Sequence, residues 1–222
     1  MDNGAVSRPP AVRGTATRDA LVDAAEALIA DHGFRTPSHR HIAGEAGVHV
    51  ALINYHFNTK EMLFETAVER RSGRLTQAWR DALQEARSQP SLEVENVLRA
   101  WWRPFAEMRA AEDPAWRNYL CVIARLSSAS YGDEWHQRYF GPIERDFQRA
   151  LADALPEASP EDIEAGFRYA RTLFAEVLLH VCGKTGSLSA PRGYRDDDID
   201  RLVSFMAHGM QALVREVDMT SH

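Results

Sequence analysis

The sequence predicts an all-α fold of about nine helices. Apolar residues recur three or four positions apart in most segments, which is the pattern of one buried helix face. Capping residues such as Ser and Thr, and terminating Gly or Pro, separate these segments. No segment has the strict two-residue alternation of a half-buried strand. The 222 residues are 45% hydrophobic and 26% charged, as in a globular protein with a sizeable core.

Four helices are predicted in the first third of the chain. The first covers 17–32. Ser38 caps a second helix, which Gly47 ends after about two turns. A third follows over 48–57, and a long fourth covers 60 to about 86. The remaining five are expected over 92–111, 114–130, 135–155 (with a bend near 141–142), 161–182 and 199–217.

The charge distribution points to the N-terminal third as the place for an anionic partner. The net charge is −6, which by itself argues mildly against nucleic acid. Residues 1–74, however, contain nine Lys and Arg, nine Asp and Glu, and five of the nine His. Residues 75–222 carry the whole excess of acid. A DNA-binding surface is therefore expected within residues 1–74.

The second and third predicted helices are too short to be stable alone and meet at Ala46-Gly47-Val48. Glycine permits a sharp turn there, which is helix-turn-helix geometry with the later helix in a major groove. Val48, Ile53 and Phe57 are expected in the core. The opposite face, from His49 to Tyr55, contains no acidic residue. The candidate DNA-binding residues are Ser38, Arg40, His49, Val50, Ala51, Asn54, Tyr55, His56 and Lys60.

Each candidate type has a role in DNA recognition. Asn54 can pair bidentately with adenine, while Val50 and Ala51 can contact thymine methyls. His49 and Tyr55 can bond to bases or phosphates. Arg40, and His56 with Lys60 near the start of the fourth helix, are placed for phosphates. A protein contact on this face is the alternative.

Three segments resemble the N-terminal domain of the tetracycline-repressor (TetR) family over about residues 15–65. They are TRDALVDAAEALIADHGF, SHRHIAGEAGV and INYHFNTKEMLF. The resemblance implies a bacterial, dimeric one-component regulator that binds DNA through its first three helices. It also implies a ligand pocket in the C-terminal domain and dimerisation through the last two long helices. The Asn-Tyr-His-Phe ending resembles a subgroup with members that respond to fatty acyl compounds.

Several residues depart from the family pattern. His49 stands where Ser is common, Val50 where Lys is frequent and Asn54 where Tyr is frequent. Pro37 replaces a usual Ser or Thr. Because these positions face DNA or cap helices, the operator sequence cannot be transferred from the family.

The domains expected are a flexible arm (1–14), a helix-turn-helix DNA-binding domain (15–60) and a ligand-binding and dimerisation domain (61–222). Aromatic residues in the last are suited to an apolar pocket, although most such residues form plain core. The candidate ligand-binding residues are Trp102, Phe105, Tyr119, Ile123, Phe147 and Phe174. Polar groups that could orient a ligand are Arg103, Glu107, Arg125, Ser128 and Glu176. An apolar stripe from Phe167 to Val181, with another over 202–213, is expected to bury a second subunit.

The function expected is a one-component transcriptional regulator, most simply a repressor. It would bind a palindromic DNA operator as a homodimer and be released by a small, largely apolar effector. The alternative is a helical small-molecule-binding protein without DNA binding, and activation in place of repression stays open.

No catalytic pair or HExxH motif is found, and His39 and His41, two apart on a helix, do not share a face. We therefore expect no enzyme, cofactor or metal. No apolar run could span a membrane, no secretory signal is evident, and Cys121 and Cys182 read as buried free thiols of a cytoplasmic protein.

Overall fold

The computed structural model describes residues 10–110, 113–128, 133–181 and 196–219. These residues form helices and their connections, with no strand among them. The helices are α1 (Pro10–His32), α2 (His39–Glu45), α3 (Ala51–Phe57), α4 (Lys60–Arg87), α5 (Val94–Ala110), α6 (Pro114–Ser128), α7 (Asp133–Tyr139), α8 (Gly141–Ala154), α9 (Pro160–Val181) and α10 (Asp196–Met219). The predicted all-α class is confirmed.

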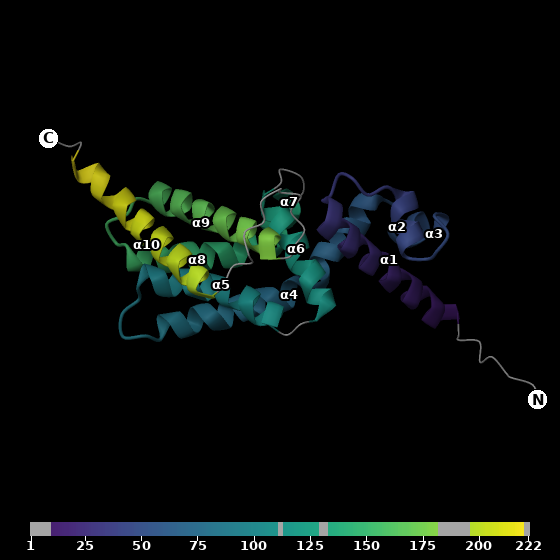
Figure 1. Cartoon of the computed structure of the whole chain (residues 1–222), viewed down its shortest axis with the longest axis horizontal. Helices are drawn as coiled ribbons and strands as arrows, with labels where there is room; N and C mark the ends of the chain where they lie inside the picture. The colour runs from purple at the N-terminus through teal and green to yellow at the C-terminus, as the bar shows by residue number, and fades with distance from the viewer. Residues whose placement is uncertain (1–9, 111–112, 129–132, 182–195, 220–222) are drawn as a thin grey trace, which may run out of the picture.

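The molecule is elongated, with α1, α2 and α3 at one end and α10 at the other (Figure 1). The long helix α4 starts beside α3 and continues into the larger part of the chain, where it packs on α5. Helix α1 also contacts α6. The N-terminal helices therefore meet the rest of the chain along α4 and α6.

Two helix boundaries differ from the sequence prediction. The helix expected over 135–155 is two helices, because Pro142 has no N–H to donate into a helix interior and is accommodated in the first turn of α8. Helix α1 begins at Pro10, so the last residues of the expected arm are helical. Proline is favoured at such a first-turn position. The rest of the arm lies outside the described residues.

The N-terminal helices share a small apolar core. Ile42 of α2, Ile53 and Phe57 of α3, and Leu63 and Phe64 of α4 are all buried. Helices of seven residues gain their stability from such packing. Their position is thus set by α1 and α4.

The larger core is aromatic. Trp79 of α4 stacks on Trp101 of α5, with ring centroids 4.3 Å apart. The Trp79 indole N–H donates to the Trp101 carbonyl at 2.8 Å. Phe140 and Phe147 meet these rings edge to face. Such pairs add to the stabilisation from burial alone.

Cys121 is buried in α6 and disulfide-bonded, so the interpretation of this residue as a free thiol is wrong. Cys182 lies outside the described residues. No helix in the described ranges is both long enough and apolar enough to cross a membrane.

The apolar stripe of α9 does not face outward. Its residues from Phe167 to Leu178 are buried within the subunit, and the side chain of Val181 lies outside the described set. The α9 stripe predicted to bury a second subunit is therefore core. Large apolar side chains are nevertheless exposed on the outer faces of the last two helices, with Tyr169 56%, Leu173 37% and Phe205 70% exposed.

Candidate DNA interface and ligand cavity

The turn between α2 and α3 is fixed by backbone hydrogen bonds around Gly47. The Gly47 N–H donates to the Gly44 carbonyl at 3.1 Å, and the Val48 N–H donates to the Ala43 carbonyl at 2.9 Å. This is a Schellman motif, whose central residue must have a left-handed backbone. Gly47 has φ +64°. The glycine thus sets the angle at which α3 leaves α2.

Helix α3 has one buried and one exposed face. Ile53 and Phe57 are 0% and 3% exposed, whereas Tyr55 is 79% exposed and Val50 39%. Ala51 and Asn54 are exposed too, and His56 is half-buried. Val48, predicted to be buried, is partly buried against the core. The surface that α3 presents to solvent therefore carries the side chains predicted to contact DNA.

Two predicted DNA-binding residues also stabilise the helices they begin. The Ser38 hydroxyl accepts the His41 N–H at 3.2 Å, which caps α2. His49 Nδ1 accepts the Ala51 N–H at 3.3 Å at the start of α3. The sequence did not identify the second contact, because histidine is not a usual N-cap residue. Both residues remain exposed.

Lys60 is tied to the protein more closely than expected. Its ammonium group donates to the Pro37 carbonyl at 3.3 Å and lies 5.5 Å from the centre of the Phe64 ring. These contacts join the start of α4 to the turn before α2. Arg18, which the sequence interpretation did not select, places its guanidinium 5.0 Å from the centre of the Phe57 ring. Arg18 is exposed, so a cation of α1 lies beside α3.

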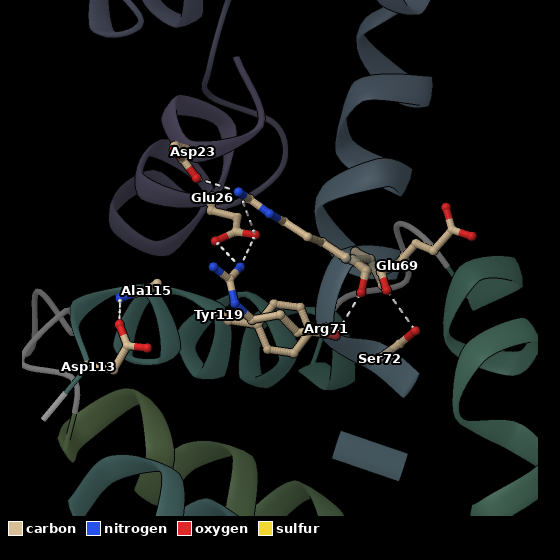
Figure 2. Close-up of polar contacts among 10 residues, drawn as sticks. Asp23, Glu26, Glu69, Arg71, Ser72, Asp113, Ala115 and Tyr119 are labelled. Carbon is tan, nitrogen blue, oxygen red and sulfur yellow. Dashed lines mark hydrogen bonds and ion pairs between the residues drawn. The ribbon is translucent and has the colours of Figure 1, made fainter. Parts of the chain in front are cut away.

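A buried ion pair joins α1 to α4 (Figure 2). The Glu26 carboxylate accepts from one Arg71 nitrogen at 2.5 and 2.7 Å, and a nitrogen of Arg70 lies 3.7 Å away. Glu26 is 2% exposed. Burial raises the pKa of Glu26 to about 7 against the opposing effects of Arg71 and Arg70. The Glu26–Arg71 ion pair therefore lies in a buried position, where removing its charges from water costs free energy.

Helix α6 completes this junction. The Tyr119 hydroxyl donates to the Val68 carbonyl of α4 at 2.7 Å, and the Arg71 guanidinium lies 5.8 Å from the Tyr119 ring centre. Arg125 donates to the carbonyls of Ala30 and Asp31, at the end of α1, at 2.9 and 3.1 Å. Arg125, predicted to orient a ligand, instead holds α1 against α6.

An internal cavity lies between α4, α5, α6, α7, α8 and α9. Three candidate ligand-binding residues line it, namely Phe105, Ile123 and Phe174. Its free volume is about 10 Å³, the room of about one water molecule. Tyr119 lies at the junction described above, and Phe147 packs between Trp101 and Phe167. Trp102 lines a separate open groove of about 400 Å³ between α4, α5 and α10.

Three ionisable side chains also line the cavity, and the sequence interpretation selected none of them. His136 Nε2 lies 2.8 Å from Glu144 Oε1. Arg171 approaches Glu144 at 3.0 and 3.2 Å and His136 at 2.7 Å. His136 and Glu144 are each 6% exposed. The three come from α7, α8 and α9, so no local spacing reveals them.

His39, Arg40 and His41 are exposed on α2. Within the described residues, no three His, Cys, Asp or Glu side chains gather as ligands to a metal would.

The comparisons with known families agree with this architecture. The family described as "Bacterial regulatory proteins, tetR family" matches residues 21–67. "Tetracyclin repressor-like, C-terminal domain" matches residues 99–209, half of the chain. The chain belongs to the TetR family. As a TetR-family protein, it is a transcriptional regulator with an N-terminal DNA-binding helix-turn-helix and a C-terminal ligand-binding domain.

Solved structures of TetR-family proteins share this fold. A TetR-like regulator from Rhodococcus sp. RHA1 is 20% identical with a TM-score of 0.57, and the match covers 93% of this chain and 99% of that one. HlyIIR, a hemolysin II transcriptional regulator, is 18% identical with a TM-score of 0.57, over 87% and 98% of the two chains. The fatty acid degradation regulator FadR from Bacillus halodurans is 20% identical with a TM-score of 0.52, over 88% and 97%. No curated protein matches the sequence.

Proposed function

We propose that this TetR-family chain is a dimeric repressor that binds a palindromic operator and is released by a small, largely apolar ligand. The observation that carries the proposal is the two-faced helix α3. Its buried face fixes it to the core, and its exposed face presents Val50, Asn54 and Tyr55 with no acidic residue. This is the surface that a major groove accepts.

The proposed DNA-binding domain covers residues 15–60. Residues 61–222 are proposed to bind the ligand and to form the dimer. Val50, Ala51 and Asn54 would read base edges, and His49 and Tyr55 would contact bases or phosphates. Ser38, Arg40, His56 and Lys60 would position the domain on phosphates. Arg18, beside Phe57, joins this second group. The protein can bind an operator only in the compartment that contains the DNA, so the proposal includes a cytoplasmic location.

A palindrome requires two copies of α3 about one DNA turn apart, roughly 34–36 Å. The exposed apolar side chains of Tyr169 and Leu173 on α9, and Phe205 on α10, are the proposed contacts of a two-fold interface. Helices α9 and α10 belong to the larger part of the molecule, away from α2 and α3, so an interface on them leaves the DNA-binding helices free (Figure 1).

Ligand binding would be transmitted to the DNA-binding helices through α6. This helix lines the cavity with Ile123 and holds the end of α1 through Arg125. It also holds α4 through Tyr119. A ligand that opens the cavity moves these attachments and changes the spacing of the two DNA-binding ends. Linkage then requires operator and ligand to weaken each other equally, typically by about 1–3 kcal/mol.

Selection of bound duplexes from a random DNA pool tests the proposal. We expect the selection to enrich a palindromic duplex that binds two subunits. A folded dimer that enriches no duplex at low salt would contradict the repressor function. It would leave the alternative of a ligand-binding protein without DNA binding.

Tyr55→Ala is expected to weaken binding to the selected duplex by about 1–3 kcal/mol without changing the dimer. Tyr55 is 79% exposed, so its removal leaves no cavity in the core. Fluorescence anisotropy measures the affinity. Comparison with Tyr55→Phe separates the contribution of the hydroxyl group from that of the ring. Unchanged affinity in the alanine variant would remove Tyr55 from the interface.

Phe205→Glu is expected to shift the protein from dimer to monomer at micromolar concentration. A carboxylate in the centre of an apolar interface must lose its hydration without a partner. Sedimentation velocity measures the change, with Gln84→Glu on the exposed side of α4 as the control for added charge. A dimer of undiminished affinity in Phe205→Glu would place the interface elsewhere.

A further inference from the structure

The cavity contains a polar cluster that is incompletely paired. His136, Glu144 and Arg171 approach one another within 3.2 Å. Two of their atoms, His136 Nδ1 and Arg171 Nε, are buried and have no hydrogen-bond partner among the described residues. Such atoms are costly to leave unpaired in an apolar setting. Their presence calls for a missing partner.

The proton positions define what that partner must offer. Burial opposes the charged form of Glu144, but the hydrogen bond and charge of His136 and the charge of Arg171 outweigh it and lower the pKa of the carboxyl. An ionised Glu144 only accepts hydrogen bonds and Arg171 only donates them, so His136 Nε2 either donates to Glu144 or accepts from Arg171. In a neutral ring, Nδ1 is an acceptor in the first case and a donor in the second. Arg171 Nε is always a donor.

The rest of the cavity is apolar. Trp79, Trp101, Phe105, Phe140 and Phe174 contribute rings to its wall. Aliphatic contacts come from Ile123 and Leu178. A ligand with a ring-sized apolar body would find matching surface here, with its polar contacts confined to one side.

We propose that this cavity binds a neutral phenol or alcohol with an apolar, ring-sized body, whose hydroxyl group pairs with Arg171 Nε and His136 Nδ1. This inference rests on the proposed ligand-responsive function and names the chemical class of the ligand. A hydroxyl accepts from Arg171 and can either donate to or accept from His136. It therefore satisfies both tautomers of the ring.

Other head groups fit less well. A carboxylate would add a second negative charge beside Glu144, and like charges at such distances repel. An ammonium group cannot accept from Arg171 Nε. A pure hydrocarbon would leave both polar atoms unpaired. The cluster as a whole is near neutral, with one guanidinium against one carboxylate, which favours a neutral ligand.

The small free volume, about 10 Å³, means that binding must separate the helices that line the cavity. Helix α6 is the wall that also holds α1 and α4. Ligand entry is thus expected to be accompanied by movement at the junction with the DNA-binding helices.

Calorimetric titration of the full-length protein, without DNA, tests the inference with three probes of similar size. They are 2-naphthol, naphthalene and 2-naphthoate. We expect 2-naphthol to bind at least about tenfold more tightly than either of the other two probes. A difference of this size corresponds to one buried hydrogen-bonded group. Equal binding of 2-naphthol and naphthalene would overturn the role of the polar cluster. Tighter binding of 2-naphthoate would identify an anionic ligand and overturn neutrality, and no binding of any probe would overturn the site.

Arg171→Met is expected to abolish the preference for 2-naphthol over naphthalene while leaving naphthalene binding within about twofold. The matched control is Arg103→Met, which changes an arginine of the separate groove and should keep the preference. His136→Phe, which keeps a ring but can neither donate nor accept a hydrogen bond, provides a second variant if Arg171→Met does not fold. A preference that survives in the folded cavity variants would refute the proposal. Because these titrations contain no DNA, their failure is distinct from failure of the duplex selection.

Discussion

Replacing Arg71 with methionine is expected to lower the free energy of unfolding by about 3–5 kcal/mol above pH 7. Glu26 is 2% exposed, and Arg71 supplies both of its short contacts. Without Arg71, the carboxylate is buried with only Arg70, at 3.7 Å, to offset its charge. The loss should shrink at pH 5.5, because a protonated Glu26 no longer needs a cation.

Urea unfolding at pH 8 and pH 5.5 measures this difference. Arg74→Met is the matched control, since exposed Arg74 lies over Trp116 and makes no short contact with Glu26. The double variant Glu26→Gln, Arg71→Met should recover most of the stability at pH 8. Equal losses for Arg71→Met at the two pH values would contradict a buried charge at Glu26.

The same carboxyl gives the natural protein a pH dependence with a defined sign. The pKa of Glu26 is raised from 4.5 to about 7 on folding, so the folded state holds this proton more tightly. Its stabilising contribution is complete below pH 4.5 and is lost as the pH rises through about 7. A shift of this size corresponds to at most about 3 kcal/mol. Glu26→Gln should remove this slope.

Val50→Glu is expected to weaken binding to the selected duplex by about 100-fold or more. Val50 is 39% exposed at the start of α3, so the new carboxylate would face the phosphates and carbonyls of the groove. Like-charge contacts at an interface cost several kcal/mol. The fold should be unaffected, because the side chain remains in solvent.

Anisotropy titrations of Val50→Glu are compared with Gln84→Glu, which adds the same charge on the exposed side of α4 far along the chain. The control should bind within about threefold of the natural protein, because long-range repulsion is screened by salt. Equal affinities in the two variants would mean that α3 does not enter the groove.

The sequence predicted what depends on local patterns. Ser38 and Gly47 mark helix ends through capping and backbone preferences, and the structure places α2 and α3 accordingly. The split at Pro142 was anticipated only as a bend, since a proline near a glycine indicates a break without giving its angle. The early start of α1 was missed because the polar composition of residues 1–14 indicated a flexible arm.

The ligand cavity was less predictable because it depends on tertiary contacts. Phe105, Ile123 and Phe174 were selected from aromatic content, yet equally apolar Tyr119 and Phe147 lie elsewhere in the core. The polar cluster joins residues from three helices and has no spacing signature. Similarly, the pairing of Glu26 with Arg71 spans 45 positions. Only the packing of α1 on α4 brings these side chains together.

The central claim, that a dimer binds duplex DNA through the exposed face of α3, is tested most directly by a salt titration of the natural protein on the selected duplex. Sedimentation gives the stoichiometry in the same samples. The expected result is two subunits per duplex, with the logarithm of the association constant falling linearly as the logarithm of salt concentration rises, by about 0.9 per phosphate contact. Affinity that does not respond to salt, or a complex of one subunit with the whole palindrome, would contradict the claim.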